Sequence, residues 1–341
     1  MGKTTIGEVA MRAGVSRATA DRVLNRRGGV SAEKARAVLV SARAMRLDRD
    51  LDVPPVRMLR VCVLMQSPEN PFYERLTRGF READLVFEAQ SIRAYITHID
   101  VLDAESIRRQ LQQIAKAYDA LVIIAPARES ILIALREIAA RIPVITLATD
   151  LPLDAVHHYV GPDNYKAGRL AAELMGGLLG PPGGGVLLIA GLQEFSGHGE
   201  RKQGFLDVLV EDFPNCRVTV EIDSLDQGAV VADGVAAALA HNPDIRGIYN
   251  ISQGNDAITQ RIKRQGRPED LVFICHDLTP TTMELLRARL IDVVIDQDPM
   301  NEAKRAIELV LQHYGRLAGR QVSGATPLRL FLRENIEGEL S

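Results

Sequence analysis

The sequence predicts two structural parts in one chain: a small all-α module at the N-terminus and a larger α/β body, with parallel sheets and helices on both faces. Residues 5–45 contain helix-capping signals around a glycine-containing turn. From residue 59 onward, short apolar runs alternate with amphipathic stretches, which is typical of parallel sheets covered by helices. Charge divides at the same place: residues 1–58 hold 12 Lys and Arg against 6 Asp and Glu, and the remainder holds 29 against 38.

The N-terminal module is predicted to contain three short helices. Thr5 and Glu8 have the spacing of a capping box, so the first helix can start at residue 6. Gly14 stands where a left-handed residue would end that helix. Ser16 is placed to cap a second helix and Ser31 a third. A helix, a turn with glycine and another helix form the pattern of a DNA-binding helix-turn-helix.

The second predicted helix carries polar side chains opposite its apolar ones. Arginine on such a face matches the paired acceptors of guanine in the major groove, and asparagine suits adenine or a phosphate. A solvated charged face is the alternative, but the helix-turn-helix pattern in front of it favours DNA. We therefore expect the following residues to contact DNA: Thr5, Ser16, Arg17, Ala18, Thr19, Asp21, Arg22, Asn25 and Ser31.

The run TIGEVAMRAGVSRATADRVLN resembles the headpiece of the LacI-type (LacI/GalR) bacterial repressors, whose pattern is T-I-x-x-V-A-x-x-A-G-V-S-x-x-T-V-S-x-V-L-N. Two positions depart from it: Ala20 replaces Val, and Asp21 replaces a Ser that faces phosphate in the family. Because phosphate repels a carboxylate, Asp21 is expected either to pair with Arg17 one turn back or to accept from a cytosine amino group.

The body from residue 59 resembles the periplasmic-binding-protein type I body of the same repressors, most clearly at Val160–Met175 and Leu328–Asn335. The resulting division is a headpiece at 1–46, a linker at 47–58 and an effector-binding body at 59–341. The resemblance implies one lobe at about 59–160 with a later crossover segment, and another at about 161–290 with the C-terminal segment.

The linker is expected to hold a hinge helix only by resemblance. In the family this helix folds on DNA and inserts a Leu into the minor groove. Leu51 is the nearest candidate, but Pro54 and Pro55 would stop a helix soon after it. The formation of a hinge helix therefore stays open at this point.

Ligands of open α/β sheets bind beyond the carboxyl ends of the strands. Residues that follow the predicted strands are rich in amides, carboxylates, guanidinium groups and rings, which is the set that binds sugars and polyols. Arg128 adds a cation that leaves an acidic or phosphorylated sugar possible. The residues expected at the effector site, several of them also implied by the resemblance, are Asn70, Phe72, Tyr73, Arg128, Asp150, Arg201, Asn250, Asp277 and Gln297.

Several of these residues have a purely structural alternative. Asn70 suits the start of a helix, and Phe72 and Tyr73 suit an ordinary core. Asp277 suits the cap of the following helix. Arg201 suits an exposed surface position.

Other classes of function lack support in the sequence. No catalytic motif or phosphate-binding loop occurs, and Cys62, Cys216 and Cys275 have neither zinc nor redox spacing. No cofactor, metal or membrane span is expected, and the absence of an apolar leader favours the cytoplasm.

The sequence thus favours a ligand-responsive DNA-binding regulator, a repressor of a carbohydrate or polyol uptake or catabolism operon. Its expected partners are double-stranded operator DNA, a small effector (sugar, polyol or sugar derivative) and a second copy in a homodimer. Whether the effector releases DNA or strengthens its binding is left open. One alternative is a solute-binding protein of a sugar transporter, and another is an α/β enzyme acting on a sugar.

Overall fold

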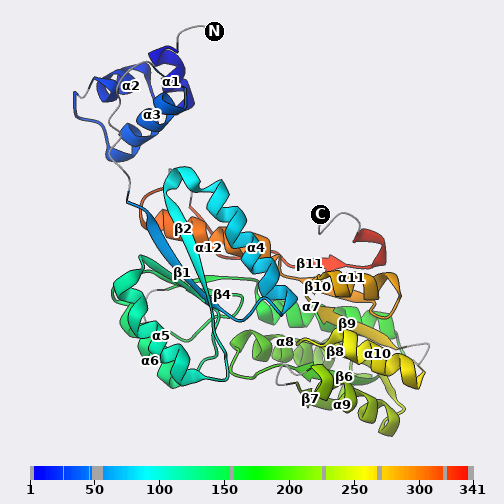
Figure 1. Cartoon of the computed structure of the whole chain (residues 1–341). Coiled ribbons are helices and arrows are strands. Elements are labelled where there is room, and N and C mark those ends of the chain that lie inside the picture. The colour runs from blue at the N-terminus through cyan, green and yellow to red at the C-terminus, as the bar shows by residue number, and fades with distance from the viewer. Residues whose placement is uncertain are drawn as a thin grey trace.

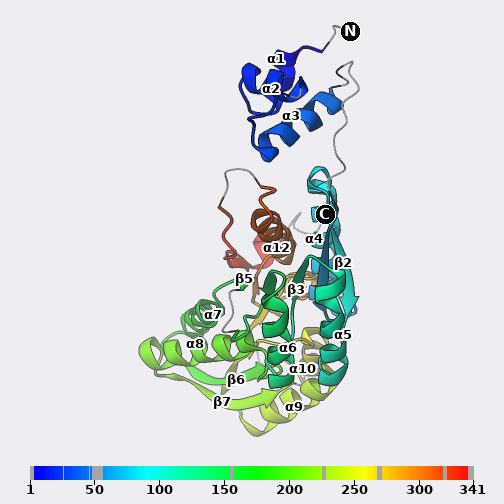
Figure 2. The same ribbon diagram turned by 90° about the vertical axis from the view of Figure 1, so that its left-hand side faces the viewer.

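The computed structural model describes residues 4–25, 27–45, 47, 57–153, 157–224, 228–266, 271–317 and 321–336. Within them the chain forms an N-terminal helical bundle and two α/β units, each built around its own sheet (Figures 1 and 2). Leu51, Pro54 and Pro55 lie outside the described residues, and with them the expected hinge helix. The predicted fold class is confirmed.

The N-terminal bundle follows its predicted capping signals. Thr5 and Glu8 form the reciprocal capping box, and the Ser16 hydroxyl accepts from the N–H of Thr19. Gly14 has the predicted left-handed backbone, with φ of 64°. The three helices are α1 (Ile6–Arg12), α2 (Arg17–Leu24) and α3 (Ala32–Ala44). They enclose a small core of Val9, Ala10, Ala20, Leu24, Val38 and Ala42.

The first α/β unit has a five-stranded parallel sheet in the order β2-β1-β3-β4-β5. Its strands are β1 (Leu59–Met65), β2 (Ile92–His98), β3 (Ala120–Ile123), β4 (Val144–Leu147) and β5 (His158–Val160). The helices within this segment are α4 (Pro71–Val86), η1 (Glu88–Gln90), α5 (Ala104–Ala117) and α6 (Glu129–Ala139). Strand β5 was not predicted, because it is only three residues long and begins with an exposed histidine.

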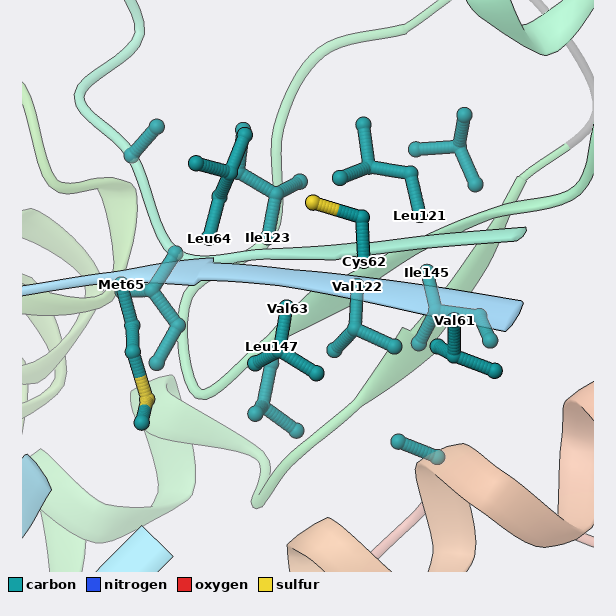
Figure 3. Packing of buried hydrophobic residues seen from close by; sticks show 14 of the residues in the cluster. Val61, Cys62, Val63, Leu64, Met65, Leu121, Val122, Ile123, Ile145 and Leu147 are labelled. Carbon is teal, nitrogen blue, oxygen red and sulfur yellow. The ribbon is translucent and has the colours of Figure 1, made fainter. Parts of the chain in front are cut away.

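Both faces of this sheet are buried. Figure 3 shows Cys62, Leu64 and Ile123 on one side of the sheet, and Val61 and Val63 on the other. Such strands read as continuous apolar runs rather than as alternating patterns, because helices cover them from both sides. Burial also raises the pKa of the Cys62 thiol to about 12, so this cysteine is an inert core residue.

The second α/β unit has a six-stranded sheet in the order β11-β10-β9-β8-β6-β7. All its pairings are parallel except that of β10 with β11, so the parallel pattern ends at this edge. The strands are β6 (Gly184–Ala190), β7 (Cys216–Asp223), β8 (Ile245–Asn250), β9 (Val272–His276), β10 (Val293–Asp296) and β11 (Arg329–Phe331). The helices are α7 (Asn164–Leu179), α8 (Ser196–Asp212), α9 (Gly228–His241), α10 (Asn255–Gln265) and α11 (Pro280–Arg287), with η2 (Arg333–Asn335) near the end.

The chain passes between the two units three times. It leaves the first sheet after β5, returns after β10 as helix α12 (Pro299–His313), and leaves again to form β11. Helix α12 packs against α4 and against strands β4 and β5 of the first unit. It ends four residues earlier than predicted, since Gly315 adopts a left-handed backbone with φ of 63°.

Helices α7 and α8 lie side by side at unusually close range (Figure 2). A Cβ added to Gly168 of α7 would lie 1.9 Å from the backbone oxygen of Arg201 in α8. A Cβ added to Gly204 of α8 would lie 2.1 Å from the backbone oxygen of Tyr165. Glycine at both positions lets the two backbones meet, which fixes the start of α8 against the start of α7.

This contact predicts opposite effects for two glycines of α7. We expect Gly168→Ala to lower the free energy of unfolding by about 2–3 kcal/mol, because the new methyl meets backbone that cannot rotate away. A Cβ at Gly177 meets nothing within 4 Å. Gly177→Ala is therefore expected to be neutral or to stabilise by up to about 1 kcal/mol. Chemical denaturation measures both, and equal stability of the two variants would contradict the close contact.

Candidate functional site

A cleft of about 590 Å³ lies between the two α/β units, at the carboxyl ends of strands from both sheets. This is where the strand-end rule places ligands in open α/β folds. Its walls come from the segments after β1, β3 and β4 on one side, and after β6, β8, β9 and β10 on the other. Six of the nine residues expected at the effector site line it: Asn70, Phe72, Tyr73, Arg201, Asp277 and Gln297.

A chain of hydrogen bonds fixes the polar groups on one wall of the cleft. Arg201 Nε donates to Asn164 Oδ1 over 2.8 Å, and Arg201 Nη2 donates to Gln297 Oε1 over 3.2 Å. Gln297 Nε2 donates in turn to Asp277 Oδ1 over 2.9 Å. These bonds use two of the five guanidinium N–H groups and one carboxylate oxygen, so Arg201 and Asp277 keep donors and acceptors for vicinal hydroxyls.

The cleft carries little net charge. Burial raises the pKa of Asp277, and the nearby Arg201 guanidinium opposes this shift. Burial, followed by the charge of Arg201, lowers the pKa of His198 to about 3. The pKa of His276 lies well below its ordinary value for the same two reasons. Both histidines are therefore neutral at physiological pH, and the wall offers one cation and one carboxyl group.

Aromatic rings supply the apolar part of the cleft. Phe72 and Phe195 are buried and line it from opposite units. Tyr73 meets Phe72 edge to face at 5.1 Å, and its hydroxyl accepts from Gln66 Nε2 over 2.9 Å. Asn70 both lines the cleft and caps α4, because its Oδ1 accepts from the N–H of Phe72. Asn70 therefore has the structural role of a helix cap and also remains part of the cleft wall.

Three expected residues lie outside the cleft lining. Arg128 reaches away to the backbone oxygen of Leu102 and to Glu194. Asp150 accepts from His157 and from a threonine of β4. Asn250 is fully buried and holds its own loop through Gln253 and Asn255. Each follows a strand as predicted, but each is bonded to a protein partner, and none is among the residues that line the cleft in this structure.

The expectation also missed several lining residues. The strand-end rule does name Phe195 after β6 and Ser252 after β8, although neither was kept in the expected set, and it would also have found Gln66 directly after β1 and Gln253 after β8. His198 and Thr149 are harder to find, since the first lies inside a helix and the second is a small side chain. The lining residues that were not expected are Gln66, Ile124, Ala148, Thr149, Phe195, Gly197, His198, Ile251, Ser252 and Gln253.

Backbone strain gathers at the cleft. Among the described residues, five non-glycine residues have positive φ. Ala148 and Asp277 are two of them, with φ of 59° and 67°, and both line the cleft. Asp298, with φ of 60°, directly follows the lining residue Gln297. Such conformations cost energy and are typical of binding sites, where the surrounding structure enforces them.

A buried ion pair joins the two units beside the cleft. Arg75 of α4 donates to both oxygens of Asp296 at the end of β10, over 2.6 and 3.2 Å. Both side chains are less than one-tenth exposed. Arg75 also donates to the backbone oxygen of Leu278, whose own N–H donates to Asp296. The start of α4 is thereby tied to two strand ends of the other unit.

Glu302 of α12 is fully buried close to this pair. Neither of its carboxyl oxygens has a hydrogen-bond partner among the described residues. Burial raises its pKa well above the ordinary value, and the nearby charges of Asp277 and Asp296 raise it further. Glu302 is therefore held as the neutral acid.

The outer face of α2 forms the candidate DNA interface. Arg17, Ala18, Arg22 and Asn25 are exposed, and none is packed into the small core. Asp21 does not pair with Arg17. Its carboxylate instead accepts from Asn25 Nδ2 over 2.7 Å and from Arg27 over 3.4 Å, because both follow it on the same side of the helix end.

The expected hydroxyl residues of the headpiece act as helix caps. Thr5 pairs reciprocally with Glu8, and Ser16 accepts from the N–H of Thr19. Ser31 accepts from the N–H of Lys34 over 3.4 Å. These three hydroxyls thus stabilise the helix starts that bring α2 to the surface.

Two family models match this chain. Residues 5–45 match the bacterial regulatory proteins of the lacI family, and residues 61–318 match the periplasmic binding protein domain. The chain belongs to the periplasmic binding protein family and begins with a lacI-family DNA-binding domain. It is a ligand-responsive DNA-binding transcriptional regulator and not an enzyme.

Individual proteins are similar to this chain over most of its length. The maltose regulon regulatory protein MalI of Escherichia coli (strain K12) is 25% identical over 301 residues, which cover 83% of this chain and 85% of that protein. A glucose-galactose binding protein, GanP, from Geobacillus stearothermophilus has a TM-score of 0.73 at 20% identity, covering 83% of this chain and all of that one. A carbohydrate transporter solute binding protein from Agrobacterium radiobacter, solved with D-arabinose, has a TM-score of 0.74 at 17% identity, covering 83% and 97%.

Two other kinds of site are absent from the part of the chain that the structure describes. No helix there is both long and apolar enough to cross a membrane. No group of three or more His, Cys, Asp or Glu side chains there is arranged to hold a metal ion.

The buried acid of Glu302 predicts a pH-dependent stability. Because its folded-state pKa is raised, its contribution is fully present below the unfolded-state value near 4.5 and is lost as pH rises through the folded-state pKa. Glu302→Gln keeps the shape without the titration. Its stability relative to the wild type should therefore rise between pH 5 and pH 8, at up to about 1.4 kcal/mol per pH unit. Denaturation at several pH values tests this, with Glu74→Gln on the exposed side of α4 as the control for charge. A difference that stays constant across this range would contradict the assignment.

Proposed function

We propose that this regulator is a repressor whose effector is a carbohydrate or polyol, and that it controls genes for uptake or catabolism of that compound. The observation that carries the proposal is the arrangement of Arg201 and Asp277, which Gln297 bridges, between buried rings in a cleft of little net charge. Carboxylates and guanidinium groups bind vicinal hydroxyls, and rings pack on the C–H faces of sugars. The printed names of the relatives, a maltose regulon regulator and sugar-binding proteins, support the same ligand class.

The position of Arg128 bears on the charge of the effector. Its side chain belongs to a contact with Glu194 and is absent from the cleft lining. Among the described residues that line the cleft, Arg201 therefore has no second Lys or Arg beside it for a phosphate or carboxylate. This favours a neutral compound over an acidic or phosphorylated one.

On the DNA side, we infer that α2 enters the major groove of an operator. Arg17, Arg22 and Asn25 supply its exposed base-reading groups, whereas Asp21 is partly engaged by neighbours. The Asp21 carboxylate can accept a hydrogen bond from a cytosine amino group, whereas a phosphate would repel it. Thr5, Ser16, Ala18, Thr19 and Ser31 complete the proposed contact surface.

We further propose that the regulator works as a homodimer in the cytoplasm, where its DNA lies. One helix-turn-helix covers one half-site, so a palindromic operator needs two copies with half-sites about 34 Å apart. Leu85 and Val86 end α4 with exposed apolar side chains beside the edge strand β2, and we place the second copy against them. The headpiece at 1–46, the linker at 47–58 and the two-lobed body at 59–341 are the functional division that we propose.

A solute-binding protein of a transporter is the alternative with the same body. The solved neighbours include such proteins. The lacI-family domain at residues 5–45 favours the regulator instead, because a transporter's binding protein has no use for a DNA-reading helix.

A substitution of Arg22 tests whether α2 contacts the bases of the operator. We expect Arg22→Ala to weaken specific operator binding by about 10- to 100-fold at constant salt, since it removes one bidentate contact. Effector binding should not change. Arg141→Ala, an exposed arginine of the body, controls for the loss of one charge. The DNA is a promoter fragment that the wild-type protein protects from nuclease cleavage. Fluorescence anisotropy with this fragment measures the affinity of both variants, and an unchanged affinity of Arg22→Ala would count against the interface.

Asp277 is the residue with which to test the cleft. A panel of neutral sugars and polyols is expected to contain at least one compound that raises the melting temperature of the wild type. We expect Asp277→Ala to abolish this stabilisation, because the main acceptor for hydroxyls is gone. Operator affinity without effector should stay within about twofold, since the headpiece is untouched. A stabilisation of unchanged size would remove Asp277 from the site.

A further inference from the structure

The effector cleft continues beyond the ring-lined compartment described above. A second, outer compartment of about 750 Å³ adjoins it, and the two share part of their walls. The shared residues are Asn70, Phe72, Ser252, Gln253 and Asp277. Because the same side chains border both spaces, a ligand bound to Asp277 in the inner compartment lies next to the outer one.

The outer compartment differs from the inner one in its chemistry. It lies among the starts of three helices, α4, α10 and α11. Its walls beyond the shared residues are hydroxyls and amides, such as Thr281 and Asn255, with the carboxylates of Glu69 and Asp256 at the exposed edge. No Lys or Arg side chain occurs among its described lining residues, and no aromatic ring beyond Phe72 and a buried histidine.

The helix starts show which ligand atoms this compartment can receive. Helices α4 and α11 have their first N–H groups capped by Asn70 and Thr279. The residue before helix α10 is Gly254, which has no side chain to cap the helix, and this turn lines the compartment. Its N–H groups can donate to an oxygen. However, Asp256 in the first turn of α10 already complements the helix dipole, and Glu69 adds a second carboxylate. An anionic group would therefore be repelled, whereas hydroxyls would find both donors and acceptors.

We propose that the effector is an uncharged molecule of two joined units, a disaccharide or a glycoside. One sugar ring lies in the inner compartment between Arg201 and Asp277 and against Phe72. The second unit lies in the outer compartment, where its hydroxyls bond to the start of α10 and to Thr281. This inference rests on the proposed function, that the cleft binds a carbohydrate effector, and it adds the size and the charge of that effector.

The first experiment is titration calorimetry of the full chain with matched probes: hexoses and pentoses, their 1→4 linked disaccharides, the 1→6 linked disaccharides and aryl glycosides of the hexoses, and hexose 6-phosphates. We expect at least one neutral disaccharide to bind tenfold or more tightly than its component monosaccharide. The 6-phosphates are expected to bind more weakly than the neutral sugars. A phosphate that binds most tightly, or a monosaccharide that no disaccharide exceeds, overturns the proposal.

The second experiment uses a substitution that fills part of the outer compartment and leaves the inner one unchanged. Thr281 is exposed at the start of α11, so Thr281→Trp adds a large side chain there without entering a core. It should weaken the preferred disaccharide at least tenfold and change the monosaccharide less than twofold. Glu284→Trp is the matched control, one turn further along α11, exposed and outside the lining. Unchanged disaccharide affinity in Thr281→Trp overturns the inference.

The failures of the two proposals are distinguishable. If monosaccharides bind and Asp277→Ala abolishes their binding, but no disaccharide or glycoside gains affinity, the extended effector is wrong and the carbohydrate sensor stands. If no neutral sugar of any length binds to the wild-type chain, the carbohydrate effector itself is wrong, and the inference fails with it.

Discussion

The buried pair of Arg75 and Asp296 is the interaction on which the arrangement of the cleft depends. Asn70 caps helix α4, whose first turn carries Phe72 and Tyr73, and Arg75 follows two residues after Tyr73. Asp296 ends β10 and is followed by Gln297. The pair therefore joins the two walls within one turn of the proposed ligand contacts. Breaking such a pair from one side leaves a buried charge and typically costs about 3–5 kcal/mol. Within the proposed mechanism, this cost disfavours arrangements of the two units in which the pair is broken.

This constraint explains how a small ligand can influence a DNA-binding domain. A ligand shifts an equilibrium only by its differential affinity for the two states. Here the candidate contacts come from both units, so closure of the units changes how many of them a ligand makes at once. Coupling between two sites is typically about 1–3 kcal/mol, which a few hydrogen bonds that form in only one state can supply. The headpiece precedes β1 of the first unit in the chain, so a rotation between the units would move the attachment point of the headpiece relative to the second unit.

The features that depend on neighbouring residues in the sequence could be predicted. Those that depend on residues distant in the sequence could not. Capping at Thr5 and Ser16 and the left-handed Gly14 were readable because each rests on neighbours within four residues. Most strands were readable as apolar runs because both sheets are covered on two faces. Strand β5 was missed because three residues hold no pattern. The contact of Asp150 with His157 was not predicted, because the position of His157 follows from the fold and not from spacing.

The strained residues around the cleft show how the structure maintains this geometry. Asp277 and Asp298 occupy left-handed backbone conformations that residues other than glycine adopt at a cost of order 1–3 kcal/mol. Each is held by bonds that a relaxed loop would lose: Gln297 donates to Asp277, and Asp296 accepts from the N–H of Asp298. The buried ion pair and its neighbours thus enforce the strain, and the strain aims the Asp277 carboxylate at the cleft. The acceptor is positioned before any ligand arrives, so little of the binding energy is spent on ordering it, and more is left to favour one arrangement of the units over another.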